Sequence, residues 1–310
     1  MADIDHPPYK SPNRRHERRF FYKYMSCRVA KTILVNRTLR WSSPLLFNDP
    51  FDVTQELRLD FTESELNQAV REEMVALIED GGTDYTPSRP RQKLLKIMID
   101  ILRERPDVRR LVVDELRRHA GATTLGQIEA MAELKERWRN LVPRFRILCL
   151  SELNDLTSMW NHYADAYRGA VLEFEAVDQL DSPFLLARPV TYQDSPPAIA
   201  NKKVWARCIL ERGLSTYIGL FTESEYVKTP DWAYEREWRI ASAARDDEDG
   251  LFSYVGFNTR ELAGVYLGTK CSQDDENEIL ALLKHGFEHV AVYKASIGGT
   301  GAKFTFQRIR

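Results

Sequence analysis

The segment from Trp232 to Ile240 carries the residues with the clearest chemical use, the carboxylates Glu235 and Glu237. It is an aromatic-rich run of the kind that is typical of a strand. Because alternate side chains of a strand share a face, we expect Glu235 and Glu237 to point the same way. Two carboxylates on one face repel each other, which raises the pKa of one of them if the face is a cleft. Such a pair suits a cation, a sugar hydroxyl or an electron-poor sugar carbon in a transition state.

A second group of polar and aromatic residues begins at Ser151, which ends an apolar run with strand character. Trp160, His162 and Tyr163 follow on a short predicted helix, where Trp160 and Tyr163 are three positions apart and share a face. Two interpretations remain open. The aromatic side chains pack a core and a carbonyl satisfies His162, or Ser151, His162 and Tyr163 border a cleft that also contains the acid pair.

A third group, Tyr22-Lys23-Tyr24, lies near the start of the chain in a short aromatic segment that predicts a strand. On a strand both tyrosines share one face and Lys23 points to the other. The tyrosines could cover a core, or the group could contact a nucleotide and its phosphates, and the pattern does not choose between these alternatives.

The elements that must position these groups are mostly strands without a regular strand–helix alternation, which predicts an α+β fold. We expect a flexible N-terminal arm over residues 1–19, a core over 20–61 and 143–310, and a helical insertion over 62–142. The insertion begins with a capping box, Thr62 with Glu65, followed by apolar residues at helical spacing. Within the core, residues 30–41 are expected to form a strand or hairpin and residues 202–221 a helix.

Composition excludes several classes of protein and site. The 310 residues have a formal net charge of −2, so no overall field draws the chain onto nucleic acid or membrane. No apolar run is long enough to span a membrane, and the polar first residues lack a secretory signal, which predicts a cytoplasmic protein. The cysteines are far apart with no Cys-x-x-Cys pair, which argues against zinc and against a disulfide framework. Phosphate-binding glycine loops, a nucleophile elbow and a His-Glu-x-x-His motif are also missing.

The motifs taken together resemble a bacterial family catalogued as a domain of unknown function, number twenty-nine seventy-one. The residues that carry the resemblance are Tyr22-Lys23-Tyr24, Phe47-Asn48-Asp49-Pro50-Phe51-Asp52, Cys149-Leu150-Ser151, Met159-Trp160-Asn161-His162-Tyr163-Ala164, Gly169 and Trp232-Ala233-Tyr234-Glu235-Arg236-Glu237-Trp238-Arg239. This family looks related to the ADP-ribosyltransferase superfold, which implies a split, twisted β-sheet core that grips NAD in a cleft.

The resemblance implies an NAD-dependent ADP-ribosyltransferase whose acceptor is a protein or nucleic acid, in the manner of a toxin or phage-defence effector with a neutralising antitoxin. Glu237 would then be the catalytic carboxylate, and Glu235 would orient or deprotonate the acceptor. The expected cofactor-binding residues are Tyr22, Lys23, Tyr24, Ser151, Trp160, His162 and Tyr163. Two alternatives stay open: a nucleotide-binding module of the same superfold without turnover, and a nuclease in which Glu235 and Glu237 bind a divalent metal.

Overall fold

The computed structural model describes residues 9–53, 57, 61–82, 85, 90–118, 132, 135–194, 202–211, 223–298 and 303–310. The chain divides into two compact units. Unit 1 contains residues 1–52, 143–194 and 228–310, and unit 2 contains residues 53–142 and 195–227. Residues 195–227, which the sequence analysis assigned to the core, therefore group with the helical segment. Each unit is described by itself.

Unit 1 is built on a mixed sheet whose strand order is β12-β11-β10-β4-β1-β3-β2-β9, with β8 paired to β3 and β5. The strands are β1 (Phe20–Met25), β2 (Thr38–Ser42), β3 (Phe145–Ser151), β4 (Ala170–Glu175), β5 (Arg188–Pro189), β8 (Glu237–Ala243), β9 (Phe252–Gly256), β10 (Leu262–Leu267), β11 (Ala291–Gly298) and β12 (Lys303–Arg308). A short pair includes β6 (Thr191–Tyr192). Among the strands that the structure describes in this sheet, only the β10–β11 pair is parallel. The predicted α+β class is confirmed.

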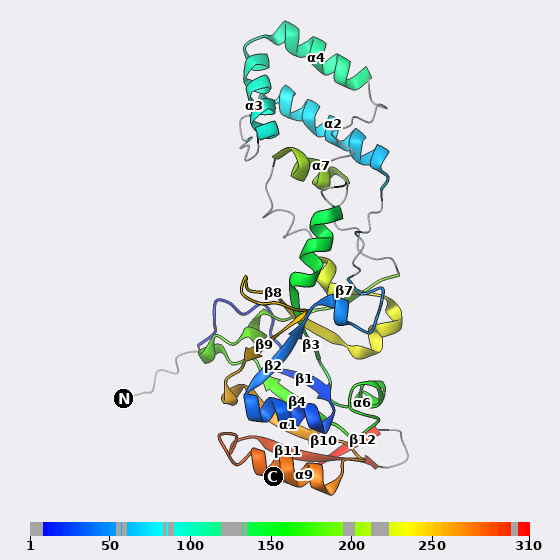
Figure 1. Ribbon diagram of the computed structural model, residues 1–310, viewed down its shortest axis with the longest axis vertical. Coiled ribbons are helices and arrows are strands. Elements are labelled where there is room, and N and C mark those ends of the chain that lie inside the picture. The colour runs from blue at the N-terminus through cyan, green and yellow to red at the C-terminus, as the bar shows by residue number, and fades with distance from the viewer. Residues whose placement is uncertain are drawn as a thin grey trace, which may run out of the picture. The chain divides into compact units, whose positions relative to one another are not determined.

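Two helices cover one face of the sheet, α1 (Cys27–Asn36) and α9 (Gln273–Leu282), and they lie side by side (Figure 1). The prediction of a strand over residues 30–41 is wrong for most of its length, because α1 continues to Asn36 and β2 begins only at Thr38. Ser26 caps the helix by accepting a hydrogen bond from the backbone of Val29, and Ala30, Ile33 and Leu34 are buried at helical spacing. This tertiary burial overrides the strand preference of the β-branched residues.

The other face of the sheet carries an aromatic cluster around α6 (Thr157–His162). Trp160 is fully buried there, and its ring lies 5.6 Å from that of Tyr24 and 5.7 Å from that of Phe304. The indole Nε1 donates to the carbonyl of Asn154 at 2.7 Å, so the polar atom of this tryptophan is satisfied within the core. The cluster fixes α6, and with it the residues that follow Trp160.

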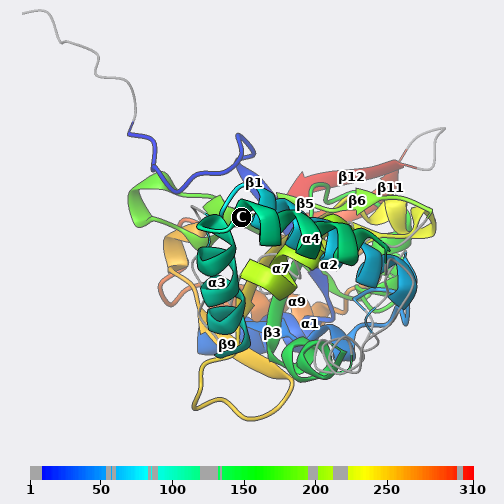
Figure 2. The same ribbon diagram turned by 90° about the horizontal axis from the view of Figure 1, so that it is seen from above.

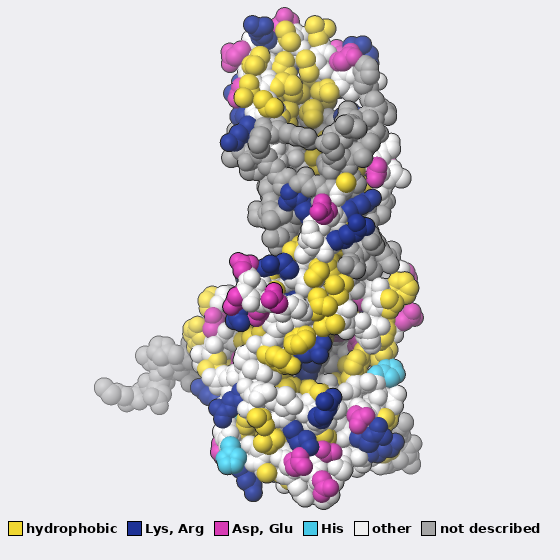
Figure 3. All heavy atoms as spheres, viewed as in Figure 1, with side chains coloured by type: hydrophobic (Ala, Val, Ile, Leu, Met, Phe, Trp, Pro, Cys, Tyr) yellow, Lys and Arg dark blue, Asp and Glu magenta, His cyan; other side chains and the backbone are white. Residues whose placement is uncertain are grey.

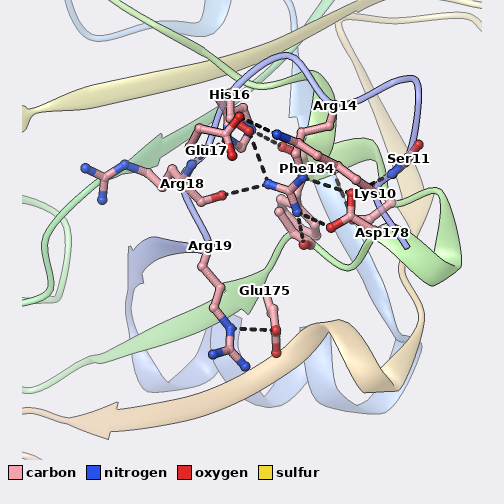
Figure 4. A network of polar contacts seen from close by, with 12 residues as sticks. Lys10, Ser11, Arg14, His16, Glu17, Arg18, Arg19, Glu175, Asp178 and Phe184 are labelled. Carbon is pink, nitrogen blue, oxygen red and sulfur yellow. Dashed lines mark hydrogen bonds and ion pairs between the residues drawn. The ribbon is translucent and has the colours of Figure 1, made fainter. Parts of the chain in front are cut away.

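The N-terminal segment is not a free arm over its described part, which begins at residue 9. Arg14 donates to both carboxylate oxygens of Asp178, at 2.9 and 2.7 Å, and to the carbonyl of Ala176 at 2.8 Å (Figure 4). Ser11 is buried and donates from its backbone to the same carboxylate. The expectation of a flexible arm over residues 1–19 is therefore corrected for residues 9–19, while residues 1–8 lie outside the described part.

Arg14→Lys is expected to lower the free energy of unfolding by about 2 kcal/mol, because an ammonium cannot replace the forked contact with Asp178 and the carbonyl contact together. Urea denaturation of the two proteins measures this difference. Arg15→Lys is the matched control, since the neighbouring Arg15 side chain is exposed. Equal stability of wild type and Arg14→Lys would show that the anchor contributes nothing to folding.

Unit 2 is helical in its described part. It contains α2 (Glu63–Glu79), α3 (Pro90–Arg103), α4 (Pro106–Arg118) and α7 (Lys202–Glu211), and α2 packs along α7 and against α4 (Figure 2). The predicted capping box is confirmed at the start of α2. Residues 212–222 of the predicted 202–221 helix lie outside the described part. Apolar side chains gather on the surface of these helices (Figure 3). Four apolar side chains of α3 and α4 are each more than half exposed: Leu94, Ile97, Ile101 and Leu111.

Candidate functional site

The sheet of unit 1 opens between β1 and β3. The two strands share a single partnership, Tyr22 with Ser151, whereas β1 pairs with β4 along all six of its residues. β8 pairs with β3 along its full length, so β1 and β2 share the other edge of β3, and β2 meets it only at Ser42 and Ile147. Where the ladder is missing, the ammonium of Lys23 reaches across and donates to the carbonyl of Cys149 at 2.7 Å. The divergence leaves room for side chains to line a cavity inside the sheet.

A cavity of about 420 Å³ lies at this opening, within the range that small-molecule sites occupy. Its wall comes from β1, β2, β3 and β8, from the segment 46–52 and from the end of α6. The predicted site residues among those that line it are Tyr22, Lys23, Tyr24, Ser151, His162, Tyr163, Glu235 and Glu237. Segments separated by more than 200 positions in the chain thus meet around one cavity.

Arg239 forms the centre of a charged network at the cavity wall. Its guanidinium donates to both oxygens of Glu237, at 2.8 and 3.0 Å, and forms a forked contact with Asp52 that includes a 2.9 Å bond from Nη1. Arg239 is completely buried, and Asp52 and Glu237 are almost so. A buried guanidinium held by two carboxylates is strongly oriented, because each of its N–H groups has a fixed acceptor.

Lys228 connects this network to Glu235. Its ammonium lies 2.5 Å from Glu235 Oε2 and 3.1 Å from Glu237 Oε2. The other oxygen of Glu235 accepts a 2.6 Å hydrogen bond from the hydroxyl of Tyr163, which in turn accepts from Asn48 at 3.1 Å. The acid pair therefore shares one cation, which relieves the repulsion that the spacing of the two carboxylates implied.

Within this network the three carboxylates of Asp52, Glu235 and Glu237 are paired with two cations, Lys228 and Arg239. Two further cations, Lys23 and Arg40, lie elsewhere on the cavity wall. Burial raises the pKa of Asp52 and that of Glu235. Burial alone would also raise the pKa of Glu237, but the adjacent charges of Arg239 and Lys228 outweigh it and hold that pKa at about 2. Glu237 is thus the carboxylate that stays ionised, and Glu235 is the one that takes up a proton more readily.

Glu235 and Glu237 both line the cavity, but they do not lie on one continuous strand as predicted. A 3-10 turn covers Pro230–Glu235, and Arg236 follows in the left-handed region with φ 48°, so β8 begins only at Glu237. Ser151 donates its hydroxyl to the carbonyl of Glu235 at 2.7 Å, and the Tyr192 hydroxyl accepts from the backbone of Glu237 at 2.9 Å. The expected alternation along a strand is therefore wrong, although both side chains converge as expected.

Trp160 is placed differently from the other predicted cofactor-binding residues. It is fully buried in the aromatic cluster and is not among the residues that line the cavity. The first interpretation of the Trp160 group, core packing, holds for this residue. His162 and Tyr163 do border the cavity, and the ring nitrogen Nδ1 of His162 lies 3.2 Å from the Tyr234 hydroxyl. Tyr163, rather than Trp160, is the aromatic residue available to a bound ligand.

The cavity is also lined by four residues that were not predicted as site residues, Asp52, Lys228, Arg239 and Arg40. Asp52 and Arg239 belong to motifs that carried the family resemblance. A signal was present in the alternation of β8, because Arg239 follows Glu237 by two positions and must share its face. Lys228 and Arg40 offered no comparable signal, since single basic residues are common on surfaces.

A second cavity of about 480 Å³ shares part of the same wall. Lys23, Tyr24, Arg40, Ser42, His162 and Tyr163 line both cavities. The second one continues over apolar side chains of α1 and β2, which include Val29, Ile33 and Leu39. The two cations of the shared wall, Lys23 and Arg40, lie between the first cavity, which holds the three carboxylates, and the more apolar second cavity. An elongated ligand with a central anionic group would match this arrangement of charges.

Residues 159–240 match the family model described as a protein of unknown function (DUF2971). This match supports the predicted resemblance to that family, and it includes residues 159–162 of α6 together with Glu235, Glu237 and Arg239. No curated protein and no solved structure matches the chain. Among the described residues, no helix combines the length and apolar character that a membrane crossing requires. The same part of the chain shows no group of three or more His, Cys, Asp or Glu side chains placed to hold a metal.

Proposed function

We propose that unit 1 binds NAD in the cavity of the open sheet and transfers its ADP-ribose to a macromolecular acceptor, a protein or a nucleic acid. The observation that carries the proposal is the group of three buried carboxylates, Asp52, Glu235 and Glu237, that lines one cavity together with tyrosines and cations. Breaking the bond between nicotinamide and ribose builds positive charge on the ribose carbon, as in glycoside cleavage. A preorganised negative site stabilises that charge without reorganisation.

Each carboxylate has a separate part in this reaction. Glu237, which stays ionised, stabilises the ribose cation while nicotinamide leaves as a neutral molecule. The acceptor then forms its bond to the ribose carbon and gives up a proton. Glu235 takes that proton, because burial has raised its pKa toward the range of a general base. Tyr163 holds the Glu235 carboxylate in place through the 2.6 Å hydrogen bond.

The remaining wall fits the other parts of the dinucleotide. Tyr22, Tyr24 and Tyr163 offer rings against a flat heterocycle. Lys23 and Arg40 lie on the wall common to the two cavities, where a diphosphate would meet them. Each of the two volumes, about 420 and 480 Å³, lies in the range of small-molecule sites, and their shared wall favours a ligand that extends from one to the other.

A second candidate function is nucleotide binding without turnover, and a specific observation favours it. Both oxygens of Glu237 already accept hydrogen bonds from Arg239, and Lys228 lies 3.1 Å from one of them. A carboxylate that is fully paired in the unbound protein has less charge to offer a transition state. A metal-dependent nuclease is the weaker alternative, because Lys228 and Arg239 occupy the oxygens that a metal would need.

Incubation of the purified chain with NAD in the presence of EDTA separates these functions. Release of free nicotinamide, measured by chromatography, supports the transferase. NAD binding measured by calorimetry without release of nicotinamide supports the binding module and contradicts the transferase. Cleavage of nucleic acid that requires added Mg²⁺ or Mn²⁺ and ignores NAD would support the nuclease.

Unit 2 is proposed to select the acceptor. We expect that Arg109→Glu with Arg110→Glu lowers ADP-ribosylation of a nucleic-acid acceptor at least tenfold and leaves NAD hydrolysis nearly unchanged, because phosphate contacts depend on these charges. Labelled NAD incorporation over a salt series measures the effect, which should shrink as salt rises. Arg117→Glu is a poorer probe, since Arg117 is paired with Glu79 at 2.7 Å. Loss of both activities in a folded variant would show that unit 2 supports the cavity instead.

A further inference from the structure

Two cysteines that the proposed reaction does not use lie next to each other in unit 1. Cys27 is the first residue of α1, and Cys271 lies between β10 and α9. Their sulfur atoms are 3.6 Å apart, although 244 positions separate them in the chain. Both side chains are buried, with 4% of Cys27 and 9% of Cys271 exposed. The fold therefore brings the two thiols together inside the protein, where the sequence showed only widely spaced cysteines.

The surroundings distinguish the two sulfur atoms. Cys27 donates to the carbonyl of Arg168 at 3.2 Å, and the ammonium of Lys294 donates to the carbonyl of Cys271 at 3.2 Å. The adjacent Cys27 thiol is the main cause that lowers the pKa of Cys271, and the charge of Lys294 adds to it. The contact with Cys271 and burial raise the pKa of Cys27. Cys271 is thus the sulfur that reacts as a thiolate, and Cys27 is the thiol that resolves it.

We propose that Cys27 and Cys271 form a reversible redox pair that closes to an intramolecular disulfide when the protein meets hydrogen peroxide. The disulfide bond is about 2.05 Å long, so thiols 3.6 Å apart can close by side-chain rotation with a small movement of the backbone. The Cys271 thiolate attacks peroxide, which breaks the O–O bond and gives a sulfenic acid and hydroxide. The Cys27 sulfur then displaces water from that sulfenic acid, so two thiols are oxidised and one peroxide is reduced to two waters.

Disulfide formation would remove one of the contacts that hold a strained loop. Asp165, Ala166 and Tyr167 have φ angles of 48°, 50° and 70°, a left-handed run that non-glycine residues rarely adopt. The hydrogen bond from Cys27 to Arg168 is one of the contacts that hold this run, and it disappears when the thiol proton is lost. The loop directly follows α6 and Tyr163, so the oxidation state of the pair is coupled to a wall of the cavity.

Peptide mapping of the full chain tests the disulfide. The protein is exposed to hydrogen peroxide, alkylated with N-ethylmaleimide, digested without reductant and analysed by mass spectrometry. We expect a peptide pair joined through Cys27 and Cys271, lighter than the two reduced peptides by two hydrogen atoms and separated by dithiothreitol. Cys149→Ser should form the same pair. Alkylated Cys27 and Cys271 after peroxide, or Cys271 carried on to sulfinic acid with Cys27 still alkylated, would overturn the proposal.

Hydrogen exchange tests the coupling to the loop and does not depend on NAD turnover. Peroxide should speed amide exchange in the peptide that contains residues 165–168 at least severalfold, and dithiothreitol should restore the original rate. Cys27→Ser is the matched control, because its hydroxyl can still donate to the Arg168 carbonyl but cannot form a disulfide. This variant should keep slow exchange with peroxide. Equal exchange in oxidised and reduced wild-type protein would overturn the link between the cysteine pair and the loop.

Discussion

Glu237→Gln is expected to lower NAD turnover about a hundredfold or more, because it removes the negative charge that the ribose cation requires. The structure makes Glu237 the carboxylate that stays ionised, with a pKa of about 2 held by Arg239 and Lys228. Asp52 keeps its forked contact with Arg239 in the variant, so the guanidinium is not left without a buried partner. The protein is therefore expected to remain folded at 25 °C, and the loss should appear in turnover more than in NAD binding.

Chromatographic assay of nicotinamide release, together with calorimetric NAD binding, measures the two effects separately. Glu261→Gln is the matched control. Glu261 is also a buried acid, and it is not among the residues that line the cavity. Burial raises the pKa of Glu261, in contrast to that of Glu237. Equal turnover in wild type and Glu237→Gln would contradict the assignment of Glu237 and favour a non-catalytic role for the charged network.

Glu235→Gln should have a different signature. Because Glu235 is proposed to accept a proton from the acceptor, its loss should lower transfer more strongly than simple NAD hydrolysis, in which water replaces the acceptor. The ratio of labelled acceptor to free ADP-ribose reports this difference directly. Loss of the two activities in equal proportion would assign both carboxylates to the same step.

The strands and several helices were accessible from local pattern. The apolar run that ends at Ser151 predicted β3, and the capping residues predicted α2, because both signals depend on neighbours within a few positions. The prediction of a strand in the region of α1 was wrong, because its β-branched residues favour a strand locally. Burial of one helical face against the sheet stabilises the helix instead. Local propensity is a weak guide wherever long-range packing supplies most of the free energy.

The candidate site was predictable in part of its membership but not in its connections. The acid pair and the tyrosines of β1 were identified because their residue types and spacing are unusual. The cation that joins the acids, Lys228, was missed because its role depends on a turn that brings it to Glu235 and Glu237 at once. The placement of Asp52 beside Arg239 likewise depends on contacts across 187 positions of the chain. Ion pairs of this kind have no local sequence signature.

Arg239→Met is expected to destabilise the protein by about 3–5 kcal/mol at pH 7, the usual cost of removing one partner from a buried ion pair. The methionine fills much of the same volume, so the loss reports the carboxylates of Asp52 and Glu237 that remain without their guanidinium. Urea denaturation measures the effect. Adding Asp52→Asn to Arg239→Met should recover part of the loss, because one of the two stranded charges is then absent.

The pH dependence of this loss is a second test of the same network. In the wild type the pKa of Glu237 is about 2, below its usual 4.5, so its contribution is present above pH 4.5 and is lost as the pH falls toward 2. Without Arg239, burial should instead raise this pKa, and the variant should lose stability as the pH rises through the usual value. The difference in unfolding free energy between wild type and Arg239→Met should therefore be largest near neutral pH and should shrink in acid. A difference that stays constant from pH 7 to pH 4 would mean that packing, not charge, accounts for the role of Arg239.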